Sequence, residues 1–475
     1  MGTQCTPEQL AFQAIGRRGV VGRFDGGFLT SDGGALVLRE ADLRLDLTRR
    51  MAACFTDFRE SWRVEHSVES LVAQRVHGLA LGYEDLNDHD RLRSDPLLAL
   101  AAGKGDLTGG DRPRTRDRGK ALAGSSTLNR LELGVPEADE ERWRYSKIVA
   151  DEKALGRLLV DLFLESRDPP AGPVWLDFDA TDDPLHGDQE GRFFHGYYKS
   201  YCYLPLYIFS GGDLLCARLR PSNIDASAGS VKELERIVRR VRRRWPEAWL
   251  IVRGDSGFCR EEFMSWCEDN GVDYVLGLKR NERLVKRIAK AMRKSRSRHV
   301  ATGEASRRFR EFRYRTRTSW SRSRRVVAKA EWLAKGDNPR FVVTSLSQKV
   351  AGAQHLYEQL YCARGDMENR IKECQLALFA DRTSTATMQA NQLRLHFASF
   401  AYALLHGLRR LALTGTRWAK AQCGTIRVRW LKVAARVKIT ARKVWVSFAS
   451  AYPYREEFAA IAQALRKGPA RAPPA

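Results

Sequence analysis

The segment between Pro173 and Lys279 constrains the fold most strongly, because its apolar residues come in short runs separated by turns and amphipathic stretches. Three runs, VWLDFDAT, YLPLYIFS and LLCARLRPS, follow one another closely, and the glycines 211–212 predict a hairpin turn between the last two. A helix (VKELERIVRRVRRRW), a strand (AWLIVRGDSG), a helix (REEFMSWCEDNG) and a strand (DYVLGLK) come next. This β-β-β-α-β-α-β order predicts an α/β fold with a mixed sheet and helices on its faces.

Acidic residues stand near the ends of two of these strands. Asp179 lies in WLDFDATDD, where strand alternation places Asp177 on the same face, and Asp255 closes the strand AWLIVRGD. Ligands of α/β sheets commonly bind at such an edge. An aspartate after a strand also commonly caps a turn, and for Asp255 alone that is the simpler interpretation.

A third acid lies on the predicted helix YCARGDMENRIKECQ. Residues spaced by three and four on one face of this helix are polar, namely Tyr361, Arg364, Glu368, Lys372 and Gln375. A polar stripe in a long chain suggests the wall of a site, although Glu368 alone would be an ordinary surface glutamate. With Asp179 and Asp255 it would supply hard oxygen ligands for two Mg²⁺ or Mn²⁺ ions.

The charge of the chain points to a polyanionic partner. The 475 residues carry 81 Lys and Arg against 57 Asp and Glu, a net charge of +24. Nucleic acid is the commonest cytoplasmic polyanion, and a membrane is not expected because no apolar run reaches about 18 residues. The densest basic cluster, either a phosphate-binding surface or a solvated helix face, comprises Arg287, Lys290, Arg293, Lys294, Arg296 and Arg298.

Other segments carry weaker signals. Near the start of the chain, ALVLREADLRL has helical periodicity. Four neighbours, Tyr197, Tyr198, Lys199 and Tyr201, interleave aromatic rings with a cation, which suits either stacking on bases or packing in a core. Trp320 and Trp332 lie in a β-rich segment and could stack on a flipped base or simply pack. Nine scattered cysteines without a CxxC spacing are typical of a reduced, cytoplasmic protein.

Together these motifs resemble a known family. The order Asp-Ala-Thr, Asp-Ser-Gly and Tyr361-x-x-Arg364-x-x-x-Glu368 is similar to the DDE transposases of bacterial insertion sequences. The segments HGLALGYEDLNDHDRLRSDP, SSTLNRLE, RGDSGF, RGDMENRIKE and ASAYPY resemble the thirteen-eighty group of those elements. The resemblance extends over nearly the whole chain.

The resemblance implies a ribonuclease-H-like catalytic core, split by a β-strand insertion, after a mostly helical N-terminal region. It implies that Asp179, Asp255 and Glu368 bind two Mg²⁺ (or Mn²⁺) ions, and that Tyr361 and Arg364 contact a phosphate. The family pattern favours Asp179 over Asp177 as the first ligand. Where the wider signature has a lysine, seven residues after the glutamate, this chain has Gln375, and Lys372 on the same face is the alternative phosphate contact.

We accordingly expect six regions in the chain. They are an N-terminal DNA-end-binding and dimerisation region (1–120), a helical connector (121–170), the first part of the core (171–283), a basic β-rich insertion (284–350), the second part of the core (351–412) and a basic C-terminal region with a disordered tail, KGPARAPPA (413–475).

The expected function is that of a cytoplasmic DNA transposase, nucleoid-associated when bound to DNA. It would bind the terminal inverted repeats of its element as a homodimer, hydrolyse the phosphodiester at each end and join the freed 3′-hydroxyl to target DNA. The alternatives are a metal-dependent nuclease without strand transfer, or a non-catalytic DNA-binding protein.

Overall fold

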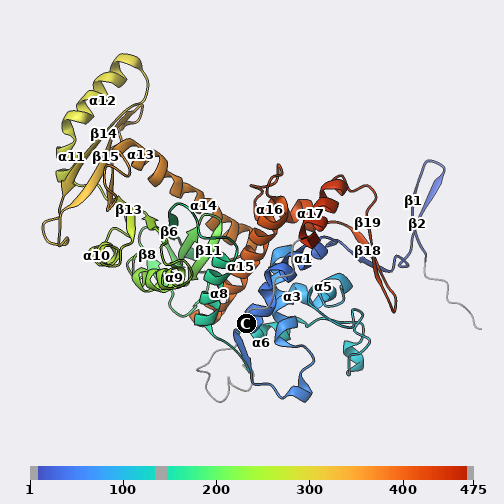
Figure 1. The fold of residues 1–475 in the computed structure, drawn as a ribbon. Coiled ribbons are helices and arrows are strands. Elements are labelled where there is room, and N and C mark those ends of the chain that lie inside the picture. Colours follow the sequence, from blue (N-terminus) through green and yellow to red (C-terminus); the bar gives the residue numbers. More distant parts are fainter. Residues whose placement is uncertain (1–8, 134–146, 468–475) are drawn as a thin grey trace, which may run out of the picture. The chain divides into compact units, whose positions relative to one another are not determined.

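The computed structural model describes residues 9–133 and 147–467 (Figure 1). The expected disordered tail lies outside these residues from position 468 on. The chain forms two compact units: one is built from both ends of the chain, up to Ala150 and from Leu404 on, and the other is the continuous segment Asp151–Ala403.

The continuous unit contains the predicted mixed sheet and its helices. Its strands are β6 (Val174–Ala180), β7 (Asp183–Pro184), β8 (Phe193–His195), β9 (Ser200–Tyr203), β10 (Leu206–Ser210), β11 (Asp213–Arg218), β12 (Leu250–Gly254), β13 (Asp273–Leu278), β14 (Ser306–Tyr314), β15 (Arg324–Leu333), β16 (Gly336–Asp337) and β17 (Arg340–Thr344). Its helices are α8 (Glu152–Glu165), α9 (Ser230–Arg244), α10 (Glu261–Asp269), α11 (Glu282–Arg287), α12 (Ala289–Thr302), α13 (Ala353–His355), α14 (Gly365–Lys372) and most of α15 (Met388–Leu408).

The nine-stranded sheet has the order β11-β10-β6-β12-β13-β17-β15-β14, with β16 paired to β15. The first three strands, β6, β10 and β11, are antiparallel neighbours, whereas β12 and β13 run parallel to β6. Three antiparallel strands followed by two parallel crossovers make the mixed sheet that the strand order predicted, and this arrangement is the ribonuclease-H-like one that the resemblance implied. The hairpin turn between β10 and β11 lies at residues 211–212, as expected.

Both faces of this sheet are covered. On one face Leu176, Val252 and Tyr274 belong to a large core that the apolar sides of α8, α9 and α10 complete. On the other face Ile251 and Val275 pack against Leu356 and Tyr357 of the helical segment that begins with α13. Side chains alternate along β12, so Val252 points into the large core on one face and Ile251 points to the helical segment on the other.

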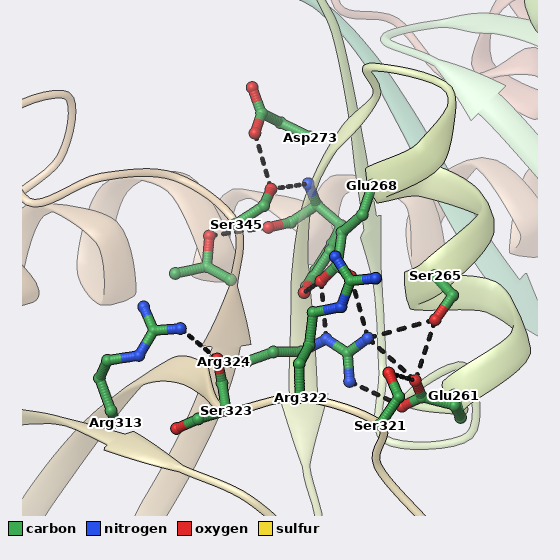
Figure 2. Close-up of polar contacts among 12 residues, drawn as sticks. Glu261, Ser265, Glu268, Asp273, Arg313, Ser321, Arg322, Ser323, Arg324 and Ser345 are labelled. Atoms are coloured by element: carbon green, nitrogen blue, oxygen red, sulfur yellow. Dashed lines mark hydrogen bonds and ion pairs between the residues drawn. The ribbon is translucent and has the colours of Figure 1, made fainter.

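The insertion extends the sheet instead of forming a separate layer, because β17 pairs with β13 and β14 pairs with β15. Helices α11 and α12 lie beside β14 and β15 (Figure 1). The buried guanidinium of Arg324 fixes the insertion to α10 through ion pairs of 2.6 Å to Glu261 and 2.7 Å to Glu268 (Figure 2). Burial alone would raise the pKa of Glu261, but hydrogen bonds from Arg324 and Ser321 lower it to about 2.

The unit built from both chain ends is mostly helical. Its helices are α1 (Ala35–Leu45), α2 (Leu47–Ala52), α3 (Val68–Leu81), α4 (His89–Leu92), α5 (Pro96–Ala101), α6 (Ser125–Glu132), α16 (Cys423–Ile426) and α17 (Arg455–Lys467). Its strands are β1 (Leu10–Ile15), β2 (Arg18–Gly22), β3 (Phe28–Thr30), β4 (Phe55–Asp57), β5 (Ile148–Ala150), β18 (Ala435–Ile439) and β19 (Val444–Phe448). Short 3₁₀ turns at 61–63, 86–88 and 115–117 and π-helical turns at 409–413 and 427–431 connect them.

Local sequence explains the helix ends in this unit. Asp95 caps α5 by accepting hydrogen bonds of 2.7 Å from the backbone N–H of Leu97 and 3.0 Å from that of Leu98, and Pro96 occupies the first helical position, where no N–H is needed. Helix α3 ends at Gly82, whose φ of 98° suits glycine. The breaks that these residues signal in the sequence are therefore helix boundaries.

The two ends of the chain meet in a small sheet of this unit. Strand β18 pairs with β3 on one side and with β19 on the other, so residues about four hundred positions apart share a ladder. Gly33 and Gly34 touch the backbone of the 430–433 segment so closely that a Cβ on Gly34 would lie 2.0 Å from the carbonyl oxygen of Trp430. Glycine is required at this contact.

Candidate active site

Strand β6 carries both aspartates of the predicted pair, but the structure gives them different surroundings. Asp177 is buried and accepts two hydrogen bonds from Arg253 on the neighbouring strand β12, of 2.6 and 2.8 Å. The same guanidinium donates a 2.9 Å bond to the carbonyl oxygen of Leu360. Asp177 therefore joins two strands and a helix, whereas Asp179 lies at the strand end.

Asp255 follows β12 in a tight turn, and its carboxylate accepts a 2.8 Å hydrogen bond from the backbone N–H of Gly257. Gly277 on β13 allows this turn to lie close to the sheet. A Cβ at position 277 would lie 2.6 Å from the hydroxyl oxygen of Tyr361 and 2.9 Å from the backbone nitrogen of Ser256. Gly277 was not singled out from the sequence; its only signal is a glycine inside the strand DYVLGLK.

The polar helix is interrupted by π-helical turns. The segment Leu356–Tyr361 is π-helical, a short 3₁₀ turn (Cys362–Arg364) leads into α14, and a second π-helical turn, Glu373–Ala377, follows it. Such turns insert an extra residue in a helix and occur frequently at functional sites. Here they flank the turns that carry Arg364 and Glu368.

Arg364 lies between two of the three candidate acids. Its guanidinium donates a 3.2 Å hydrogen bond to Asp179 and a 3.3 Å hydrogen bond to Glu368, one helical turn along. Glu368 is about half exposed, with 53% of its side chain accessible, whereas Asp179 is mostly buried. The strand-end acid and the helix acid are thus brought together around one cation.

The pKa of Asp179 is shifted by its burial and by the charged groups around it. Burial raises this pKa to about 6, and the carboxylates of Asp255 and Glu368 add to the increase, although Arg364 acts in the opposite direction. The carboxylates of Asp255 and Glu368 therefore disfavour ionisation of Asp179. A pKa raised by burial and by neighbouring charges is typical of functional sites.

Comparison with protein families decides the class of the chain. The model of the family described as "Transposase DDE domain group 1" matches residues 12–470. The chain belongs to this family of DDE transposases. No curated protein matched the sequence. A solved structure of a piggyBac transposase synaptic complex with hairpin DNA is similar at a TM-score of 0.40 and 10% identity, covering 83% of this chain and 79% of the other.

DDE transposases are nucleotidyl-transfer enzymes that generally use divalent metal ions. In this transposase the donor chemistry of Asp179, Asp255 and Glu368 fits such an ion, because all three are carboxylates. Among residues 9–133 and 147–467, however, no three acidic, histidine or cysteine side chains are arranged as a ready-made metal site. In the arrangement described, Arg364 supplies the positive charge to two of the carboxylates.

The remaining residues of the polar helix differ in accessibility. Tyr361 is half-buried, with its hydroxyl against Gly277, and burial raises its pKa. Lys372 is exposed. Gln375 donates a 3.0 Å hydrogen bond to the carbonyl oxygen of Asp182, just beyond β6. Gln375 thus fixes the helix to the strand end, which leaves Lys372 as the cation available to a ligand at this end of the helix.

The basic cluster of the insertion forms an exposed face. Its six members are all exposed, and we find no ion pair for any of them in the described part of the transposase: Arg287, Lys290, Arg293, Lys294, Arg296 and Arg298. Arg287 lies over the ring of Phe312, with 5.6 Å between guanidinium carbon and ring centroid, and Arg296 lies 5.2 Å from that of Trp332. The cluster spans two consecutive helices, because Arg287 ends α11 and the other members lie on α12, and exposed cations of this kind are suited to phosphate binding.

The two tryptophans of the insertion have different environments. Trp320 is only 4% exposed and packs edge-on against Tyr314 within the main core. The interpretation of Trp320 as a base-stacking residue is therefore wrong for this structure, because no face of its ring is open to a ligand. Trp332 is half-buried beneath Arg296 and retains an accessible part.

Among the described helices we find none with the length and hydropathy that a transmembrane span requires.

Proposed function

We propose that this chain is the transposase of a bacterial insertion sequence. It binds the inverted-repeat ends of the element, hydrolyses one phosphodiester at each end and transfers the freed 3′-hydroxyl to target DNA. The observation that supports the proposal is that Arg364 contacts both Asp179 and Glu368, while Asp255 contributes to the raised pKa of Asp179, within a family of DDE transposases.

In this proposal Asp179, Asp255 and Glu368 hold two Mg²⁺ or Mn²⁺ ions. The bound ions would supply Lewis-acid stabilisation of the phosphodiester and lower the pKa of an attacking water or hydroxyl. Asp179 and Asp255 have fixed positions because they end two adjacent strands. Glu368 is exposed and lies on a helix, so it is the most adjustable of the three ligands.

Arg364 has a second role in the same proposal. With cations held by these acids, the guanidinium would be available to bind a phosphate of the DNA end through its planar donors. Tyr361 and Lys372 flank it on the helix and would contact the same strand. The exposed cations of α12 and Arg287, together with Trp332, would bind DNA further away.

Two parts of the proposal rest on the family resemblance. Residues 1–120 would recognise the DNA ends and contribute to a homodimer that holds both ends. The protein would act in the bacterial cytoplasm, on the nucleoid.

The test is an assay with DNA that carries the inverted repeats flanking the gene. Wild-type protein with Mg²⁺ should cut at the repeat ends and join them to a target plasmid. Glu368→Gln should retain end binding within about threefold and lose cleavage by at least about 1000-fold, because a neutral amide is a poor ligand for Mg²⁺. Undiminished cleavage by this variant would refute the assignment of the site, and cutting without joining would identify a nuclease.

A positioning test uses Gly277, which contacts no ligand itself. Gly277→Ala should reduce cleavage about tenfold or more, because the new Cβ displaces Tyr361 and the Asp255 turn by the close contacts given above. The matched control is Gly424→Ala on α16, where an added Cβ meets nothing within 4 Å. Equal activity of the two variants would show that the close packing at Gly277 is unimportant for the reaction.

A further inference from the structure

Strands β8 and β9 form a short hairpin beside the candidate site, here called the aromatic hairpin (residues 193–203). Phe194 stands directly opposite Tyr201 in the ladder, and their rings meet edge-on with 5.5 Å between centroids. The guanidinium of Arg192 lies 3.9 Å from the centroid of the Tyr201 ring. The hairpin thus carries a cross-strand aromatic pair with a cation stacked on it.

The tip of the hairpin adds two more aromatic rings, those of Tyr197 and Tyr198, which meet edge-on. The turn is closed by a 2.8 Å hydrogen bond from the N–H of Lys199 to the carbonyl oxygen of His195, and Lys199 has a left-handed backbone with φ of 55°. Tyr197 at the tip is 83% exposed, and Phe194 is 57% exposed. Tyr201 is 45% exposed. Side chains as exposed as those of Tyr197 and Tyr201 do not belong to the core, so the alternative that these two tyrosines pack in a core does not hold.

The base of the hairpin is held firmly, so the exposed rings are not on a loose loop. Tyr203 is fully buried and donates a 2.5 Å hydrogen bond to the carbonyl oxygen of Glu190. The hydroxyl of Ser222 donates a 2.9 Å hydrogen bond to the carbonyl oxygen of Phe193. A rigid base lowers the entropy that a ligand would have to remove on binding the rings.

The hairpin also reaches the strand that carries Asp179. The hydroxyl of Tyr198 lies 3.5 Å from the carbonyl oxygen of Ala180, the residue after Asp179. Asp179 and Asp182 contribute to the raised pKa of this tyrosine, after burial. One aromatic ring therefore contacts the edge of the candidate site, while its neighbours Tyr197 and Phe194 face solvent.

We propose that the aromatic hairpin binds unpaired bases of the DNA strand at the end being processed, by stacking them on Tyr197 and on the pair Phe194–Tyr201. The exposed Lys199 supplies positive charge for the phosphates between those bases, and Arg192, which also pairs with Asp188 at 2.7 Å, supports the Tyr201 ring from behind. This inference rests on the proposed function, because it assigns a substrate segment to the same site. Exposed aromatic rings beside cations are the usual platform for single-stranded DNA, since every base has a face that stacks.

A protein partner is the other possible occupant of exposed aromatic rings. It is disfavoured by the cations among the rings and by the direct contact with the strand of Asp179, where the DNA strand has to pass. Measuring self-association of the protein alongside DNA binding distinguishes a DNA ligand from a protein partner.

The experiment compares two DNA probes in the presence of EDTA, so that no cleavage occurs. One is a blunt duplex, and the other is the same duplex with five unpaired nucleotides that contain 2-aminopurine. Full-length wild-type protein should bind the second probe more tightly and quench its fluorescence. The double variant Phe194→Ala/Tyr197→Ala should lose about tenfold in affinity for the unpaired probe, with less than twofold change for the blunt duplex, because stacking contributes roughly this much per base.

Two controls keep the result interpretable. Tyr197→Phe keeps the ring and should bind like wild type. Trp445→Ala removes an exposed aromatic ring with a lysine stacked on it, in the unit built from both chain ends, and should change neither affinity. Equal losses for both probes, no loss for either, or a loss of self-association in place of DNA binding would overturn the proposal.

Failure of the proposed function would look different. If the wild-type protein neither cut nor joined inverted-repeat ends, but the hairpin variants still lost binding to the unpaired probe, the hairpin would remain a site for unpaired DNA. If cleavage occurred normally and the variants bound the unpaired probe like wild type, only the inference about the hairpin would fail.

Discussion

Arg324 and Arg364 are both arginines between carboxylates, yet the pKa values of Glu261 beside the first and Asp179 beside the second shift in opposite directions. Around Arg324 the pKa of Glu261 falls to about 2, and that of Glu268 is also lowered. Around Arg364 the pKa of Asp179 rises to about 6. In the first cluster one buried cation serves two glutamates at short distances, whereas in the second a more distant guanidinium serves a buried acid that has two acidic neighbours.

The difference separates a structural network from the cluster that we propose to be functional. The Arg324 network holds the insertion on α10 and stabilises the fold when its acids are ionised. The Arg364 cluster contains more negative charge than its arginine compensates, which costs stability and leaves the acids ready for a further cation. The following predictions test this contrast, from the largest expected effect to the smallest.

Arg324→Met should lower the free energy of unfolding by about 3–5 kcal/mol, because it leaves two partly buried glutamates without their cation. Chemical denaturation measures the change. The matched control is Arg322→Met, whose side chain is 56% exposed and pairs with Glu268 only at 3.4 Å. It should change stability by less than about 0.5 kcal/mol. Similar losses in both variants would contradict a special role for Arg324.

Glu261→Gln should destabilise the protein by about 2 kcal/mol at neutral pH. The folded pKa of about 2 lies below the unfolded value near 4.5, so the ionised group stabilises the fold above pH 4.5. That contribution is lost as the pH falls from 4.5 towards 2, and the two proteins should then become equally stable. A difference that stayed constant over this range would show that Glu261 acts by packing alone.

Adding Mg²⁺ should stabilise the wild-type protein by about 1.4 kcal/mol at ten times its dissociation constant. Differential scanning fluorimetry with Mg²⁺ and with Ca²⁺ measures this as a shift in Tm. Glu368→Gln should respond much less, whereas Arg322→Met should respond like wild type. Equal responses of wild type and Glu368→Gln would place the ion elsewhere.

Asp179→Asn should make the fold more stable than wild type by about 1 kcal/mol at pH 7.5. The folded pKa of about 6 lies above the unfolded value of 3.8, so protonation of Asp179 stabilises the wild-type fold at low pH. This stabilisation is lost as the pH rises from 3.8 to 6. The two proteins should therefore have similar stability near pH 4, and the variant should lead above pH 6. A variant that is less stable than wild type at every pH would mean that the charge of Asp179 is stabilised by its surroundings, as Arg324 stabilises that of Glu261.

Much of the fold could be predicted from local sequence. Periodicity identified ALVLREADLRL as a helix, and α1 spans these same residues. The strand order followed from short apolar runs and turn residues, because neighbouring strands of the core are also close in sequence. The addition of β17 to the edge strand β13 was not predicted, because pairing partners across an insertion leave no local pattern.

The site could be predicted only in part. The resemblance singled out Asp179, Asp255, Arg364 and Glu368, and the structure brings Arg364 against two of these acids. That Asp177 pairs with Arg253 depends on the register between two strands, which the sequence does not specify. The sequence also does not reveal that Trp320 is buried, because an indole ring can either pack in a core or stack on a base.

The pairing of β3 with β18 has a consequence for biosynthesis. During translation the segment Asp151–Ala403 is complete in the nascent chain well before β18 is synthesised, so it can fold while the first unit still lacks a strand. The helical unit that begins the chain cannot close until residues 430–439 have left the ribosome. A nascent chain released before this point would contain the folded segment Asp151–Ala403 joined to an unfinished first unit.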